Sequence, residues 1–286
     1  MTIPNRFAMA PMTWQASPGG VPGPDVADYY ARRAAGGVGL VITEGIRLPD
    51  PAACFPESVP TLAGDDVLAG WRRMTKAVHA DGAVIAAQLW HQGAERGDAD
   101  GVAPVSPSGV NGLGESKGRA LAANELAGVA DQFAAATGNA REAGFDAVEI
   151  HGAHGYLLDE FFWEKTNLRT DGYGGLLAGR TRFPAEVVAA IRAAVGPDFP
   201  IVFRFSQWKG TDEDASIAGD PTQLQELLGA TGGRRCRGLP SVHAAALRCG
   251  LPRRRSGSQP VRLDEEGDRN ARDRGRLGET GHRLPG

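Results

Sequence analysis

Short apolar runs alternate with longer amphipathic stretches through the first 229 residues of the chain. Five apolar runs predict parallel strands buried on both faces: Arg6–Ala10, Val38–Thr43, Val84–Leu89, Ala147–Ile150 and Ile201–Phe205. Helical spacing is found near Asp25–Ala35, Asp65–Ala80, Asn124–Gly144 and Arg180–Val195. Asn124 is the expected N-cap of the third of these helices. Repeated βα units predict an α/β fold, a TIM (β/α)8 barrel that is incomplete, with about five strands in frame.

This pattern ends near Gly229. The last 56 residues contain no Phe, Tyr, Trp, Ile, Met or Lys, so we expect 230–286 to be a disordered or irregular tail behind a barrel portion of 1–229. The charge changes at the same place. Residues 1–229 hold 18 basic and 28 acidic side chains, a net charge of −10, whereas 230–286 hold 13 basic and 6 acidic side chains, a net charge of +7.

The composition of the tail allows two interpretations. A basic arm for nucleic acid is disfavoured because the tail has no aromatic residue to stack on bases and acids interrupt it. Alternatively, synonymous codons can be chosen for Gly229–Pro252 that encode a strand and a helix when read one base later. We therefore interpret the tail as translated out of frame, a hypothesis that the gene's DNA sequence tests.

Composition narrows the class of protein. The 42% hydrophobic and 23% charged residues are ordinary for a globular protein of 286 residues, and a single α/β barrel needs about 250. No apolar stretch approaches the roughly 18 residues of a membrane span, and the N-terminus lacks the apolar region of a signal peptide. We expect a cytoplasmic protein. The three cysteines have no CxxC spacing, which argues against a zinc or iron–sulfur site.

Long polar connections follow the second, third and fourth predicted strands, on the side where a barrel carries its active site. Pro11-Met12-Thr13 follows the first strand and Thr43-Glu44-Gly45 the second. Gly45 would let a flat ligand approach the backbone, although an ordinary left-handed turn glycine is the alternative. Gln88 ends the third strand beside an indole and an imidazole, and its amide has the donors and acceptor needed to bind the imide edge of a pyrimidine-like ring.

The segment His151-Gly152-Ala153-His154-Gly155-Tyr156 follows the fourth strand. If it turns into a helix, His151 and His154 can converge on one acceptor oxygen, with the Tyr156 phenol near as a proton donor. Buried structural histidines are one alternative and a zinc site is another. No third metal ligand lies at motif spacing, because we place Glu149 on the opposite strand face, so no metal is expected.

Arg204 lies inside the fifth apolar strand. A guanidinium there is costly unless an anion or a developing negative charge faces it, which favours a functional cation over the alternative of a buried structural salt bridge.

Together these motifs resemble the Old Yellow Enzyme family, the NADH:flavin oxidoreductases with an FMN-binding barrel. The resemblance extends from about Pro4 to about Gly229. It also rests on Asn5–Thr13, the run from Gly144 to Tyr156, Asn167–Gly175 and Phe203–Trp208. Several relatives carry Asn at the position of His154.

The resemblance implies a role for each candidate residue. FMN would be bound by Pro11, Met12, Thr13, Gly45, Gln88 and Arg204, with Gln88 at the N3/O2 edge and Arg204 at the N1/C2 region. His151 and His154 would bind the carbonyl or nitro oxygen of an electrophilic alkene. Flavin N5 would give a hydride to the β-carbon and Tyr156 a proton to the α-carbon. NAD(P)H would reduce the flavin first, giving ping-pong kinetics.

The resemblance predicts an FMN-dependent NAD(P)H oxidoreductase, an ene-reductase acting on α,β-unsaturated carbonyl or nitro compounds. The alternative is a non-catalytic, truncated remnant that does not retain FMN, because the phosphate-binding loops of the family follow strands that are absent from the frame as written. A larger flavin and iron–sulfur dienoyl reductase is disfavoured because no cysteine cluster follows the barrel. We expect neither nucleic acid nor membrane as a partner, and the formation of a homo-oligomer stays open.

Overall fold

The structure, a computed structural model, describes residues 1–231. The expectations for the tail from residue 232 onward lie outside the described residues. Within 1–231 the helices are α1 Pro24–Ala35, α2 Asp65–Ala80, α3 Leu126–Glu142, α4 Leu157–Phe162, α5 Leu177–Val195 and α6 Pro221–Ala230. Short 3-10 helices are η1 Pro18–Gly20, η2 Gly93–Glu95 and η3 Ala123–Glu125.

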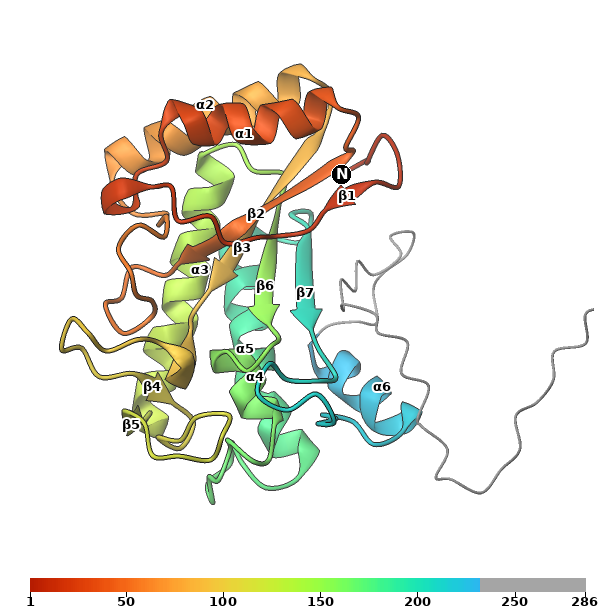
Figure 1. The fold of residues 1–286 in the computed structure, drawn as a ribbon. Helices are drawn as coiled ribbons and strands as arrows, with labels where there is room; N and C mark the ends of the chain where they lie inside the picture. The colour runs from red at the N-terminus through yellow and green to blue at the C-terminus, as the bar shows by residue number, and fades with distance from the viewer. Residues whose placement is uncertain (232–286) are drawn as a thin grey trace, which may run out of the picture. The chain divides into compact units, whose positions relative to one another are not determined.

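One parallel sheet organises the described chain (Figure 1). Its order is β1-β2-β3-β6-β7, the order of the strands in the sequence. The bounds are β1 Ala8–Met9, β2 Leu40–Arg47, β3 Val84–Trp90, β6 Ala147–Gly152 and β7 Ile201–Phe205. Each predicted strand is thus confirmed, although β1 is shorter than expected and β2 longer. A separate small parallel pair joins β4 Val105–Ser106 to β5 Arg119–Ala120.

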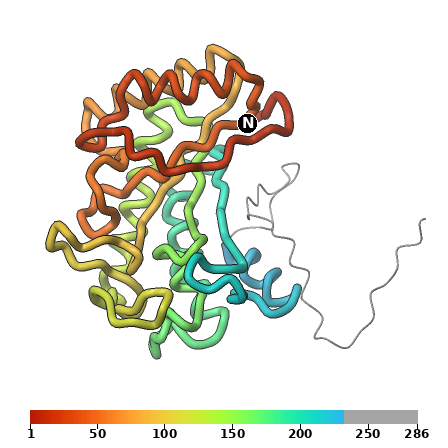
Figure 2. Tube along the Cα trace, in the orientation of Figure 1, coloured from red at the N-terminus to blue at the C-terminus, as the bar shows by residue number. Residues whose placement is uncertain are grey.

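Strand order and helix placement identify the fold class. The sheet curls and each main helix returns the chain to the next parallel strand, as the continuous trace in Figure 2 illustrates. Parallel strands in sequence order with helices on the outside form the pattern of a (β/α)8 barrel, of which the described residues supply five strands. The expected barrel class is therefore confirmed for residues 1–231.

Both faces of the strands are buried, which explains their nearly continuous apolar runs. One face packs against the helices in the large core, to which Val41, Ile85 and Val148 belong. The opposite face holds a small cluster of Leu40, Ile42, Ala86 and Ala147. The face of the strands that carries this small cluster is the inner face. Because side chains alternate along a strand, residues two or four positions after a member of the cluster, toward the carboxyl end, lie on the same inner face.

The start of the helix before β6 differs from the expectation. Asn124 is not its N-cap, because a 3-10 turn, η3, precedes α3. The carboxylate of Glu125 instead accepts a hydrogen bond from the backbone N–H of Ala122 at 2.7 Å. The sequence alone did not predict α4 or α6. α4 has only six residues, too few for a helical period to be evident, and α6 follows a long connection after β7.

Candidate functional site

A cavity of about 140 Å3 lies at the carboxyl ends of the strands. Seven of its eight lining residues were candidates from the sequence, and Trp90 is the eighth: the lining is Pro11, Thr13, Gln88, Trp90, His151, His154, Tyr156 and Arg204. Met12 and Gly45 were also expected at the site but are not among the lining residues. The side chain of Met12 is 60% exposed.

Gly45 serves the site indirectly. It lies within β2 and its backbone is not left-handed, so the alternative of a turn glycine is wrong. A Cβ atom built on Gly45 would come within 2.6 Å of the Trp90 ring. The missing side chain therefore makes room for the indole that lines the cavity.

A bulge in β2 anchors the loop that carries Pro11 and Thr13. The register between β2 and β3 shifts between Ile42 and Gly45, which displaces Thr43 and Glu44 from regular pairing. The buried Glu44 carboxylate then accepts hydrogen bonds from the backbone N–H groups of Trp14 and Gln15, at 2.8 and 2.9 Å. Burial raises the pKa of Glu44, and these two hydrogen bonds oppose that effect.

The inner face of β3, β6 and β7 supplies the centre of the site. Gln88 pairs in register with Glu149, and His151 pairs with Arg204. Gln88 Nε2 donates a hydrogen bond to Glu149 Oε1 at 2.6 Å, and Arg204 Nη1 lies 3.9 Å from the same oxygen. Glu149 is therefore on the same strand face as His151, and its expected place on the opposite face is wrong. Residues 149 and 151 are two apart, which is the period of a strand.

A turn rather than a helix brings the two histidines together. β6 ends at Gly152 and α4 begins at Leu157, so His154 and Tyr156 lie on the connection between them. His154 has a left-handed φ of 65°, and its ring centroid is 5.3 Å from that of His151 at 84° between planes. The Tyr156 ring is 5.0 Å from His151, also edge to face.

One contact fixes this turn to the loop after β7, and a second fixes it to α4. The backbone N–H of His154 donates to Ser206 Oγ at 2.9 Å, and that of Gly155 donates to Asp159 Oδ2 at 2.7 Å. Asp159 Oδ1 in turn accepts a hydrogen bond from Lys209 Nζ at 2.5 Å, and both side chains of this ion pair are fully buried. Neither Asp159 nor Lys209 was a candidate from the sequence.

Both site histidines are neutral at neutral pH. Burial lowers the pKa of His151 well below its ordinary value, and the neighbouring His154 and Arg204 lower it further. Burial also lowers the pKa of His154 to about 4, assisted by Arg204 and Lys209. A neutral imidazole carries one N–H, so each ring can donate one hydrogen bond. Burial raises the pKa of Tyr156, which keeps its phenol protonated.

Several buried polar atoms at this cavity have no hydrogen-bond partner in the structure. They are Trp90 Nε1, His151 Nδ1, and Arg204 Nε and Nη1. Buried polar groups are almost always satisfied, so a cluster of orphaned atoms around a cavity is typical of a site for a polar ligand. Arg204 does form the salt bridge that was its structural alternative, but at 3.9 Å the contact leaves two of its nitrogen atoms unsatisfied.

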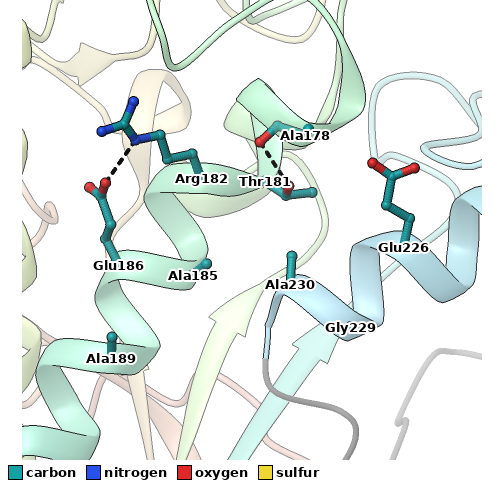
Figure 3. A pocket seen from close by; sticks show the side chains of 9 residues that line it. All are labelled: Ala178, Thr181, Arg182, Ala185, Glu186, Ala189, Glu226, Gly229 and Ala230. Atoms are coloured by element: carbon teal, nitrogen blue, oxygen red, sulfur yellow. Dashed lines mark hydrogen bonds and ion pairs between the residues drawn. The ribbon is translucent and has the colours of Figure 1, made fainter.

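A larger groove of about 580 Å3 lies between α5 and α6, away from these residues (Figure 3). Alanine and glycine dominate its lining, and its Arg182 is paired with Glu186 at 3.0 Å. It contains no group of unsatisfied polar side chains, so the smaller cavity is the better candidate site. Within residues 1–231 there is no cluster of three or more His, Cys, Asp or Glu side chains that could hold a metal ion. No helix of this part of the chain is long and apolar enough to cross a membrane.

One family model and two curated relatives match most of this chain. The model of the NADH:flavin oxidoreductase / NADH oxidase family matches residues 1–274. A 12-oxophytodienoate reductase 7 from Oryza sativa subsp. japonica is 41% identical in an alignment of 211 positions that covers 68% of this chain and 53% of the relative. An NADH oxidase from Thermoanaerobacter brockii is 41% identical over 72% of this chain and 32% of its own length. The chain thus spans about half or less of these curated relatives.

Solved structures agree with this result. Morphinone reductase superposes with a TM-score of 0.68 at 36% identity, covering 72% of this chain and 61% of the enzyme, and one of its structures contains tetrahydroNAD. The old yellow enzyme homologue from Zymomonas mobilis superposes with a TM-score of 0.71 at 32% identity, covering 80% of this chain and 66% of that protein.

Proposed function

The chain belongs to the NADH:flavin oxidoreductase / NADH oxidase family, and on that premise we propose that it is an FMN-dependent ene-reductase. FMN is the cofactor and NAD(P)H the reductant of this class of oxidoreductase. The proposed substrates are α,β-unsaturated carbonyl or nitro compounds. One observation supports the proposal. The same cavity is lined by hydrogen-bond donors that can bind a substrate oxygen and by polar groups that can bind the edge of a ring.

The chemistry of the lining suits the isoalloxazine ring of FMN. The orphaned nitrogen atoms of Arg204 are positive donors without an acceptor, and Gln88 offers an amide beside them. A ring whose N1/C2 region becomes negative on reduction would satisfy the guanidinium, and its imide edge would pair with the amide. When bound, FMN would accept a hydride from NAD(P)H and transfer it from N5 to the substrate's β-carbon.

The protein's own residues would bind and activate the substrate. His151 and His154, both neutral, can each donate a hydrogen bond to the carbonyl or nitro oxygen, which draws electron density away from the C=C bond. Tyr156 would hold a proton at its Oη for the α-carbon. Its ring packs edge to face on Trp90, with centroids 5.0 Å apart, which restricts the positions that the phenol can take.

The remnant that does not retain FMN is the alternative, and a specific observation favours it. At the candidate site the described residues enclose only about 140 Å3, whereas ligand sites usually enclose about 300–1,000 Å3. Within residues 1–231 the outer edges of β1 and β7 have no neighbouring strand in the sheet. A tricyclic ring would then be held from one side only by this part of the chain.

A titration of the full chain with two flavins separates the two functions. Lumiflavin carries the ring without the phosphate, so its binding depends on the ring site alone. We expect saturable lumiflavin binding, followed by absorbance, that is weakened in Arg204→Met and unchanged in Arg72→Met, which removes an exposed arginine. Bound FMN should lose its colour with NADH and regain it with 2-cyclohexen-1-one under anaerobic conditions. If neither flavin binds saturably, the ene-reductase proposal is wrong and the remnant is favoured.

A further inference from the structure

A buried carboxylate behind the site has no role in the proposed function. Glu149 lies in the middle of β6, and its side chain is fully inaccessible to solvent. An ionised carboxylate at such a position is expensive unless hydrogen bonds and opposite charge compensate it. Its sole compensation among the described residues is one hydrogen bond from Gln88 and the more distant Arg204, since Glu149 Oε2 has no partner. Both partners line the cavity, whereas Glu149 itself does not.

The contact with Gln88 determines how its amide is oriented. Burial raises the pKa of Glu149, and the hydrogen bond from Gln88 and the charge of Arg204 oppose that rise. In its ionised form the carboxylate can only accept hydrogen bonds, so the amide nitrogen of Gln88 faces it. The 2.6 Å separation between Gln88 Nε2 and Glu149 Oε1 matches a strong, charge-assisted hydrogen bond. The amide oxygen is then left for the cavity. Gln88 therefore presents an acceptor, which suits a ligand with an N–H on its edge.

The contact with Arg204 changes the charge that a ligand experiences. At 3.9 Å the two groups attract each other without a direct hydrogen bond, and Arg204 keeps two unsatisfied nitrogen atoms. The negative charge of Glu149 partly offsets the field of the guanidinium in the cavity. A neutral side chain at position 149 would leave that field uncompensated.

We propose that Glu149 is a positioning residue that fixes the amide oxygen of Gln88 toward the cavity and weakens the positive field of Arg204 there. This inference rests on the proposed function, because it states that Glu149 affects the relative affinities of the site for oxidised and reduced flavin. The N3–H of the imide edge needs the amide oxygen. Arg204 would stabilise a negatively charged reduced ring, and Glu149 would keep that stabilisation moderate.

The first test compares Glu149→Gln with a matched control, Glu160→Gln. Glu160 is also a fully buried glutamate with an unpartnered Oε2, but it does not line the cavity and accepts its hydrogen bond from Ala94. Dissociation constants are measured anaerobically for oxidised and reduced lumiflavin. We expect Glu149→Gln to shift their ratio about tenfold in favour of the reduced form, which corresponds to a rise of about 30 mV for a two-electron couple. Glu160→Gln should leave the ratio unchanged.

A conservative variant separates charge from packing. Glu149→Asp keeps the carboxylate, so its ratio should stay within about threefold of the wild type even if both affinities fall. The proposal is overturned if Glu149→Gln leaves the ratio unchanged, or if Glu149→Asp shifts it as far as Glu149→Gln does. A purely structural role would weaken both forms of the flavin alike.

A second measurement needs no flavin and therefore also applies if the proposed function fails. In NMR spectra of the ¹⁵N-labelled full chain, the Gln88 side-chain amide is assigned by its loss in Gln88→Met. We expect its protons to exchange with solvent more slowly than those of the exposed Gln15, and its signals to move in Glu149→Gln but not in Glu160→Gln. Exchange as fast as that of Gln15 in the wild type would overturn the positioning role. If the wild type does not bind lumiflavin but its Gln88 side-chain amide exchanges slowly with solvent, the proposed function is refuted and the positioning role of Glu149 is retained.

Discussion

Lys209→Met tests whether the buried ion pair behind the histidine turn holds the site together. Lys209 Nζ and Asp159 Oδ1 are 2.5 Å apart, and neither side chain is exposed to solvent. Removing one partner of such a pair leaves an uncompensated buried charge and typically costs about 3–5 kcal/mol of folding free energy. Burial already raises the pKa of Asp159, so protonation of this carboxyl can relieve part of the cost. We therefore expect a loss near 3 kcal/mol.

Urea unfolding followed by tryptophan fluorescence measures this loss. Trp163 is a suitable reporter, because its ring centroid lies 5.8 Å from Lys209 Nζ. The double variant Asp159→Asn/Lys209→Met removes both charges and should recover most of the stability, since a neutral pair of similar size leaves no buried charge. Arg72→Met is the control. It breaks an ion pair whose side chains are 47% and 61% exposed, and such surface pairs contribute about 0–1 kcal/mol.

Two results would refute this reasoning. Equal shifts of the urea midpoint in Lys209→Met and Arg72→Met would mean that Lys209 is solvated in solution. A double variant no more stable than Lys209→Met would mean that the loss comes from packing rather than from the unpaired carboxylate.

Two further predictions concern the site, and a third concerns the dependence of folding stability on pH. Tyr156→Phe should slow substrate reduction by about 10²–10⁴-fold while NADH-dependent flavin reduction is unchanged in stopped-flow traces, and equal losses would remove Tyr156 as the proton donor. Replacing His151 and His154 together by alanine should abolish the binding of phenols to the flavin-loaded protein, whereas retained binding would contradict their role as donors to a substrate oxygen. Burial lowers the pKa of His91 from 6.5 to about 4, so the unfolded state binds a proton that the folded state does not between these values. Folding stability should therefore decrease by up to about 3 kcal/mol as the pH falls from 6.5 to 4, and His91→Gln should make the pH profile of the urea midpoint flatter.

The strands and the segment with His151 and His154 could be predicted from sequence because their signals are local. A buried parallel strand is a short apolar run, and all five runs form strands of one sheet. The carboxyl ends of neighbouring parallel strands share one edge, which is why Gln88, His151 and Arg204 were expected to meet and do line one cavity.

Other features depend on contacts between distant residues and have no local signal. The Asp159 and Lys209 pair joins positions 50 residues apart, and the indole that covers Gly45 comes from another strand. Glu149 is different, because its place beside the site could have been predicted from the sequence. It interrupts an apolar strand as Arg204 does, and the two-residue period places it on the face of His151. Applying to Glu149 the reasoning used for Arg204 would have identified both members of this buried pair.

The backbone conformation of His154 limits which amino acids can replace it. A φ of 65° strains most side chains, and β-branched residues most of all, but His, Asn and Asp adopt this region more readily. Of these three, an ionised Asp has no proton to donate, so His and Asn remain as residues that combine a left-handed backbone with an N–H donor. The Asn that the family resemblance implies for several relatives at this position would therefore have a stereochemical explanation. A Thr or Val here would have to reshape the turn before it could affect the chemistry.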